Sequence, residues 1–372
     1  MFKKITLLSI FLTVNFLFSQ TVTTVSDGNF YDGIGQDSLG NIYCSDFSGD
    51  SVFKYSIEGI VTTFASGFSS PNGIGVNEQD EIFICDASAN TIFKYSLNGT
   101  LITNYTIGIN NPTGIKNIPG TTDMLIVEYN NDTLKRLTLD GTISTLFSGF
   151  PLNGPSGIAF INGETFISNY DDRKIMRFKD RNMTLLNQLP ATAPNNNVLG
   201  FLTASNDQLY ATLPGAHQIY TINPISGNAT LYAGSIQGSA NGDISAATFN
   251  FPNGILADTA NNRIYVSDAG TSNLRIIENV TLSTSEFETN TINLSIFADR
   301  KSDMIGIKAN LNSSEKINIK IYEITGKQVF SKDYSVSNLA FFETINKNTF
   351  NSGTYIVLFT QDNVLSSKKI TL

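Results

Sequence analysis

Carboxylate and amide side chains stand at recurring turns along this 372-residue chain, and their oxygens offer its clearest candidate chemistry. Three of them directly precede a glycine that opens a short apolar run: Asp32, Asn72 and Asn253. Five more end the apolar run that follows such a turn: Asp46, Asp86, Glu128, Asn169 and Asp268. Carboxylate and amide oxygens are the ligands that calcium prefers. The alternative is a structural role, because Asn and Asp hydrogen-bond the nearby backbone of tight turns and Gly allows positive φ.

The elements that position these residues are repeated β-strands. Short apolar runs separated by Asn, Asp, Gly and Ser are typical of a strand meander. A turn, a glycine and an aliphatic residue recur, with a weaker copy in the fifth unit, at Gly33, Gly73, Gly114, Gly157, Gly200 and Gly254. Their spacings of 40, 41, 43, 43 and 54 residues define six units, the longest with an extra loop from Gly234 to Asn250. Units of this length with four strands each are the blades of a β-propeller.

The sixth unit lacks a fourth strand before the composition changes near Thr281. Val22–Val25 at the start of the chain repeats the pattern of Val61–Phe64, so it is predicted to complete the last blade. Such a strand would close the ring and remove its open edge. The sequence therefore predicts an all-β protein, with a six-bladed propeller over residues 20–281.

This arrangement would gather the turn residues on one face of the propeller. In an antiparallel blade the first strand starts at the end where the second strand finishes. Because first strands line the central channel, Asp32, Asn72 and Asn253 should converge on the axis from consecutive blades. We therefore predict that these three bind Ca²⁺ or another divalent cation, and that the five strand-end residues form a binding face.

The repeats resemble the NHL-repeat family of propellers. The resemblance rests on the Pro-x-Gly-Ile turns, on Asn41–Asp46 and its relatives, and on Ala233–Ser235 and Phe251–Ile255. The Asn-Gly and Asp-Gly turns also resemble those of the senescence-marker/gluconolactonase family, six-bladed propellers with an axial divalent metal. That second resemblance implies a metal-dependent lactonase-type hydrolase with its site at the centre of the propeller.

A second domain follows a polar stretch at residues 282–291, which is predicted to be a linker. Residues 292–372 contain six alternating apolar runs, which suit a small β-sandwich. Ile319–Val329, Phe350–Val357 and Lys368–Ile370 resemble the C-terminal sorting domain (type A) of the type IX secretion system. This resemblance implies that the secretion machinery is a partner. A carbohydrate-binding or adhesive sandwich is the alternative.

Residues 1–19 predict a secretory signal peptide, with Lys3 and Lys4 before an apolar stretch and Ser19 at the cleavage point. No later apolar run approaches twenty residues, so no transmembrane segment is expected in the mature chain. The protein is therefore predicted to pass through the periplasm and to be secreted or held at the cell surface. In an exported protein, Cys44 and Cys85 could form a disulfide or remain two buried thiols.

Composition excludes several function classes. A net charge of −8 and a pI near 4.8 argue against nucleic acid as a partner. His217 is the single histidine of the chain, so a multi-histidine zinc site is excluded, and its turn context indicates a hydrogen-bonded or solvated loop residue. The leading hypothesis is an exported binding module for a protein or glycan. The alternative is the divalent-metal-dependent lactonase.

Overall fold

The computed structural model describes residues 20–191, 198–280, 293–298, 303–311, 316–323, 327–336, 340–361 and 364–372. In these ranges the regular structure is β-strand apart from three 3₁₀ helices, η1 (Pro214–Ala216), η2 (Thr259–Asn261) and η4 (Lys347–Thr349). The chain separates into two compact units between residues 282 and 283. None of the described segments is a helix long and apolar enough to cross a membrane. The predicted signal peptide (1–19) and linker (282–291) lie outside the described residues and stay predictions.

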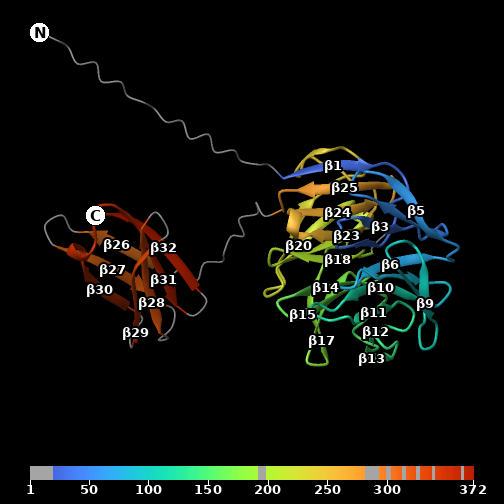
Figure 1. Cartoon of the computed structure of the whole chain (residues 1–372), viewed down its shortest axis with the longest axis horizontal. Helices are drawn as coiled ribbons and strands as arrows, with labels where there is room; N and C mark the ends of the chain where they lie inside the picture. The colour runs from blue at the N-terminus through green and yellow to red at the C-terminus, as the bar shows by residue number, and fades with distance from the viewer. Residues whose placement is uncertain are drawn as a thin grey trace, which may run out of the picture. The chain divides into compact units, whose positions relative to one another are not determined.

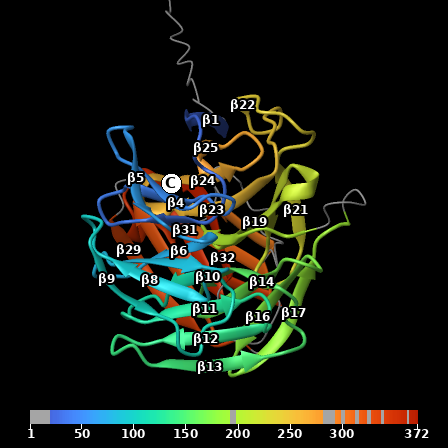
Figure 2. The same ribbon diagram turned by 90° about the vertical axis from the view of Figure 1, so that its right-hand side faces the viewer.

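The first unit is a ring of six antiparallel sheets, which confirms the predicted six-bladed propeller (Figure 1). Figure 2 shows the strands of the third blade, β10 to β13, lying side by side in chain order. The bounds in the first five blades are β2 (Ile34–Gln36), β3 (Ile42–Ser45), β4 (Ser51–Tyr55) and β5 (Val61–Ser66); β6 (Pro71–Val76), β7 (Ile82–Asp86), β8 (Thr91–Tyr95) and β9 (Leu101–Tyr105); β10 (Pro112–Asn117), β11 (Met124–Glu128), β12 (Thr133–Leu137) and β13 (Ile143–Ser148); β14 (Pro155–Ile161), β15 (Glu164–Asn169), β16 (Lys174–Lys179) and β17 (Asn182–Gln188); β18 (Leu202–Ser205), β19 (Gln208–Leu213), β20 (Gln218–Ile222) and β21 (Ala229–Ala233).

The sixth blade is closed by the N-terminal strand, as the sequence predicts. Its strand order is β22-β1-β25-β24-β23, so β1 occupies the place of a fourth strand. The bounds are β1 (Thr21–Ser26), β22 (Gly242–Asp243), β23 (Pro252–Asp258), β24 (Arg263–Asp268) and β25 (Asn273–Glu278). The short strand β22 comes from the inserted loop and pairs with Thr21 and Val22. The edge that would attract further strands is therefore partly covered.

The core of the propeller lies between its blades. The second strands β7 and β11 are buried at every residue, because neighbouring blades pack on both of their faces. Tyr43 of the first blade, for example, packs in one cluster with Ile74 and Ile84 of the second. Cys44 and Cys85 are buried free thiols in this core, and burial raises the pKa of Cys44 to about 12.

Glycines permit the innermost strands to approach one another closely around the axis. A Cβ on Gly33 would lie 2.6 Å from the carbonyl oxygen of Asn72 in the next blade. A Cβ on Gly73 would lie 2.5 Å from the carbonyl oxygen of Thr113. Real side chains do not tolerate such distances, so the recurring glycine of the sequence repeat is a packing requirement.

The second unit contains two antiparallel sheets, of order β26-β27-β30 and β29-β28-β31-β32. Their apolar faces share one core that includes Ile307, Ile319 and Phe359, which agrees with the predicted sandwich. The strands are β26 (Asn293–Ala298), β27 (Met304–Asn310), β28 (Ile317–Glu323), β29 (Gln328–Tyr334), β30 (Ala340–Asn346), β31 (Thr354–Gln361) and β32 (Val364–Thr371). The last strand, β32, is an addition to the six predicted ones.

Ring closure by β1 can be tested with one buried and one exposed position of that strand. Val22 is fully buried in the core of the sixth blade, whereas Thr23 is exposed. We expect Val22→Asp to lower the free energy of unfolding by at least about 3 kcal/mol, because it buries an unpaired carboxylate. Thr23→Asp should change it by no more than about 0.5 kcal/mol. Urea denaturation followed by circular dichroism measures both, and equal effects would contradict the closed ring.

Candidate functional site

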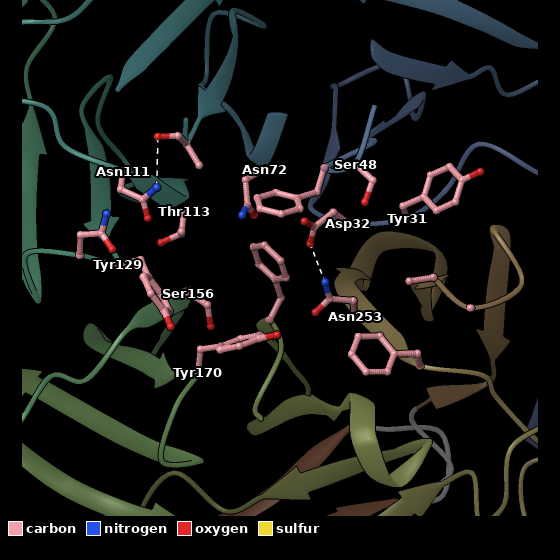
Figure 3. A pocket seen from close by; sticks show the side chains of 17 residues that line it. Tyr31, Asp32, Ser48, Asn72, Asn111, Thr113, Tyr129, Ser156, Tyr170 and Asn253 are labelled. Carbon is pink, nitrogen blue, oxygen red and sulfur yellow. Dashed lines mark hydrogen bonds between the residues drawn. The ribbon is translucent and has the colours of Figure 1, made fainter. Parts of the chain in front are cut away.

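A cavity of about 600 Å³ lies at the end of the propeller where the innermost strands begin (Figure 3). Its polar lining includes Asp32, Asn72, Thr113, Ser156 and Asn253. Its aromatic lining consists of Tyr31, Phe47, Tyr129, Tyr170, Phe201 and Phe251. A concave site of this size with a few convergent polar groups is typical of small-molecule binding. The three residues predicted to converge on the axis therefore line one cavity.

The floor of the cavity consists of equivalent positions from successive blades, which lie directly before the close-packed glycine in every blade except the fifth. Backbone hydrogen bonds define the equivalence in the fifth blade. Asp32 N–H donates to Ser45 O in the first blade, and Gly200 N–H donates to Thr212 O in the fifth. Gly200 therefore occupies the floor position and is not equivalent to Gly33, so the spacing assigned to the fifth unit from sequence is wrong by one residue. A Cβ on Gly200 would collide with Thr212 Oγ1 and approach Asn253 Oδ1 to 2.8 Å, which explains the glycine.

Asp32 is the ionisable floor residue, and it is 5% exposed. Asn253 Nδ2 donates to Asp32 Oδ1 at 2.7 Å. Burial, followed by the negative charge of Asp46, raises the pKa of Asp32 to about 8. The carboxyl group is therefore mostly protonated at neutral pH while the cavity contains no cation.

The other floor groups offer hydrogen-bond acceptors. Thr113 Oγ1 donates to Pro155 O at 2.7 Å, and Ser156 Oγ is within 3.1 Å of Gly200 O. Because these hydroxyl protons are directed at the backbone, the remaining lone pairs are available to a ligand. Asn72 Oδ1 is buried without a hydrogen-bond partner among the described residues. That oxygen is shielded from the cavity as the side chain stands, so it becomes a candidate ligand contact only when the Asn72 amide turns.

The walls come from residues that the sequence analysis did not select. Phe47, Tyr129 and Tyr170 directly follow Asp46, Glu128 and Asn169, at the position where the second and sixth blades have Ala87 and Ala269. Tyr129 donates its hydroxyl to Asp171 Oδ1 at 2.8 Å, and its ring meets Tyr170 edge-on with centroids 6.1 Å apart. A signal for these walls was present in the repeat, because this position is aromatic in three blades and is alanine or proline in the other three.

Four of the five residues predicted as a binding face end their second strands, and Asp46 directly follows the end of β3, so all five lie at the ends of the second strands opposite the starts of the first strands. Asp86, for example, pairs with Pro71, and Asp268 pairs with Pro252. Asp86, Glu128, Asn169 and Asp268 are nevertheless buried, and none of the five lines the cavity. Their side chains bind the loops of their own blades: Asp46 accepts Gly49 N–H, Asp86 accepts Ser69 and Ser70 N–H, Glu128 accepts Asn110 N–H, Asn169 donates to Pro151 O, and Asp268 accepts Asn250 N–H. Their role in binding stays a prediction.

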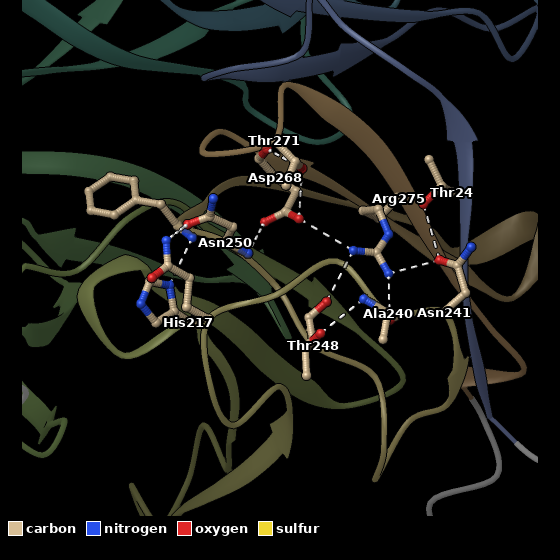
Figure 4. Close-up of polar contacts among 11 residues, drawn as sticks. Thr24, His217, Ala240, Asn241, Thr248, Asn250, Asp268, Thr271 and Arg275 are labelled. Atoms are coloured by element: carbon tan, nitrogen blue, oxygen red, sulfur yellow. Dashed lines mark hydrogen bonds and ion pairs between the residues drawn. The ribbon is translucent and has the colours of Figure 1, made fainter.

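Figure 4 shows the polar contacts around Asn250, whose loop contributes to the cavity wall. His217 Nδ1 accepts the backbone N–H of Phe251 at 3.0 Å, which makes His217 a hydrogen-bonded loop residue as expected. Asp268 accepts Asn250 N–H at 2.7 Å and lies 3.3 Å from the guanidinium of Arg275. Arg275 also donates to Asn241 Oδ1, and Thr24 of β1 contacts the same oxygen. The cavity wall and the strand that closes the ring therefore share one network of polar contacts, buried at Asp268 and Arg275 and exposed at the contact between Thr24 and Asn241.

The ligand atoms that the described cavity lining offers do not suit a divalent cation. Asp32 is the single carboxylate in the lining, and Asn253 directs an amide N–H, not its oxygen, at that carboxylate. Within the described ranges no group of three His, Cys, Asp or Glu side chains could hold a metal ion. Calcium ordinarily takes six to eight oxygen ligands. The assignment of Asp32, Asn72 and Asn253 as metal ligands therefore stays a prediction. No chemistry through a metal follows from their arrangement.

Comparison with known proteins identifies the second unit. Residues 301–372 match the family described as the secretion system C-terminal sorting domain. The protein is thus a β-propeller joined to a type IX sorting domain, and it is exported to the cell surface or beyond. No curated protein matches the chain. The assignment of the blades to NHL repeats stays a prediction.

Solved structures resemble the propeller in fold. An auxiliary nutrient binding protein from Bacteroides thetaiotaomicron has a TM-score of 0.60 at 16% identity, over 69% of this chain and 76% of that protein. A protein of the same description from Bacteroides ovatus has a TM-score of 0.58 at 13% identity, over 70% and 76% of the two chains. A gluconolactonase from Xanthomonas campestris has a TM-score of 0.54 at 14% identity, over 70% and 89%. At these identities the likeness shows a shared fold.

The raised pKa of Asp32 predicts how stability depends on pH. A carboxyl with a higher pKa in the folded state stabilises the protein below its unfolded pKa of about 4, and this contribution is lost as the pH rises through about 8. Asp32→Asn cannot ionise, so its melting temperature should fall less than that of the native protein between about pH 5 and 8. Thermal melts across pH test this, with the exposed Asp50→Asn as the matched charge control. Parallel curves for the native protein and Asp32→Asn would contradict it.

Proposed function

We propose that this protein is an exported binding module whose propeller takes a sugar-sized polar organic ligand, such as the end of a glycan, in the axial cavity. The observation that supports this most is the cavity itself, with a polar floor and aromatic walls in about 600 Å³. Aromatic side chains bury the apolar faces of a ligand, while floor oxygens fix its orientation. A protein ligand would have to insert a side chain into the same space.

The described lining offers few of the groups that hydrolysis ordinarily uses. It contains Asp32 and three tyrosines but no histidine, lysine, arginine or cysteine. General acid–base catalysis uses two groups of suitable pKa within reach of the substrate, and nucleophilic catalysis uses a nucleophile beside a base. The nutrient binding described for two proteins of similar fold is compatible with a binding role. The C-terminal sorting domain would engage the type IX machinery during export.

Truncation of the aromatic walls tests the proposal. We expect Phe47→Ala and Tyr170→Ala each to weaken binding to the best ligand on a glycan array by about tenfold or more, which corresponds to about 1.4 kcal/mol. The control is Ile225→Ala, at a residue that is 83% exposed and outside the cavity lining. Tyrosine fluorescence gives a second readout, because the chain has no tryptophan and three tyrosines line the cavity. Unchanged affinity in both wall variants would refute an axial binding site.

A divalent-metal-dependent, gluconolactonase-like hydrolase is the second candidate. The unpartnered Asn72 Oδ1 favours it, because a cation could complete the contacts of that oxygen. The similarity in fold to a gluconolactonase is compatible with it. The single carboxylate and the amide N–H directed at it count against this candidate.

Calorimetric titration with divalent ions separates the two candidates. Because the lining supplies one carboxylate, we expect no saturable binding of Ca²⁺ or Zn²⁺ to the purified protein. Binding of one equivalent of either ion, abolished by Asp32→Ala and retained by Asp50→Ala, would support the hydrolase instead. Lactone hydrolysis that depends on the added metal would be the confirming assay.

A further inference from the structure

The buried carboxylates of the propeller are almost all compensated. The described ones are Asp32, Asp37, Asp86, Asp123, Glu128, Asp258 and Asp268. Four of them pair with a cation: Asp123 with Arg136, Glu128 with Lys135, Asp258 with Arg263 and Asp268 with Arg275. Buried charges in proteins are ordinarily paired or strongly hydrogen-bonded, so these four follow the rule.

Asp37 and Asp86 have no cation but accept several hydrogen bonds instead. Asp37 accepts two backbone N–H groups, the Asn41 amide and the Tyr43 hydroxyl. Asp86 accepts three backbone N–H groups, from Ser69, Ser70 and Ala89. Both carboxylates are therefore satisfied within their own blades.

Asp32 is the exception. Among the described residues its carboxylate receives one hydrogen bond, from Asn253 Nδ2, and it has no ion pair. The ionisable groups that face it are Asp46 and Cys44 of its own blade and Tyr170 from the fourth blade, and none of them is a cation. Asp32 also lines the cavity, so a ligand can supply what the protein does not.

The surroundings of Asp32 select the kind of cation. Thr113 and Ser156 direct their hydroxyl protons at the backbone and present lone pairs beside Asp32, so the floor favours a ligand that brings several N–H donors. Six aromatic side chains form the walls, and aromatic faces attract ammonium groups electrostatically. A metal ion would need more carboxylate oxygens than the floor offers. A primary ammonium group combines three donors with one positive charge.

We propose that the floor of the axial cavity binds the primary ammonium group of an organic ligand, with Asp32 as its counter-ion. The inference rests on the proposed binding function and names the class of ligand. The remainder of the molecule lies between the aromatic walls. An amino sugar or another small amine would fit both the polar floor and the aromatic walls of the cavity.

Binding of an ammonium group must also release a proton. The pKa of Asp32 is raised to about 8 in the free protein, whereas a cation beside the carboxylate favours its ionised form. Near neutral pH, the bound amine should therefore expel close to one proton per ligand. Affinity should rise by about tenfold per pH unit below the pKa of Asp32 and level off above it.

Matched pairs of probes test the inference with the full mature protein. The pairs are 2-phenylethylamine with 2-phenylethanol and glucosamine with glucose, titrated by calorimetry near neutral pH. We expect at least one amine to bind at least about tenfold more tightly than its neutral partner. Asp32→Asn should abolish this preference, while Asp50→Asn should keep it. Titration of 2-phenylethylamine in two buffers of different ionisation enthalpy counts the released protons in the native protein, even if Asp32→Asn folds poorly.

The possible results are distinct. An amine preference with release of about one proton supports the inference. Equal binding of amine and neutral partner overturns it but leaves the binding function in place. A preference without proton release, or one retained by Asp32→Asn, overturns Asp32 as the counter-ion. No binding of any probe, together with a negative glycan array, overturns both the inference and the binding function.

Discussion

The close approach of six strands around one axis is the constraint on which the propeller depends. Gly33, Gly73 and their equivalents leave no space for a side chain because the next blade's backbone lies against them. Hydroxyl groups reinforce this contact from blade to blade: Ser168 Oγ donates to Gly200 O, Thr212 Oγ1 to Asn253 O and Ser267 Oγ to Asp32 O. Each blade thereby holds its neighbour, and the pairing of β1 with β25 completes the circle.

That constraint also creates the cavity. Because the close-packed strand start is fixed, with glycine in five blades and Phe201 in the fifth, the residue before it has a fixed place on the floor. The blades place Asp32, Asn72, Thr113, Ser156, Gly200 and Asn253 there, so one backbone position carries five residue types. The backbone is the same in each case, and the floor chemistry can differ from blade to blade without disturbing the packing.

The repeat made the ring predictable, since spacing, strand order and the closing strand all follow from a pattern that occurs several times. The fifth blade was misaligned because Gly200 sits on the floor and Phe201 takes the place that glycine has elsewhere. The sequence could not distinguish a carboxylate that binds a loop from one that faces the cavity. Asp86 and Asp32 both stand at turns, yet Asp86 accepts backbone N–H groups while Asp32 lines the cavity. That difference depends on the direction of a side chain in the folded ring.

The contrast between Asp32 and Asp268 shows that the folded ring gives two buried aspartates different partners. Burial raises the pKa of both, to about 8 for Asp32 and to about 6 for Asp268. Asp268 has Arg275 beside it and holds the loop of Asn250 next to the cavity. Asp32 has an amide and a cavity beside it. A carboxylate that is uncompensated within the chain destabilises the fold when it ionises, so its presence on the floor is consistent with the proposed partner from outside the chain.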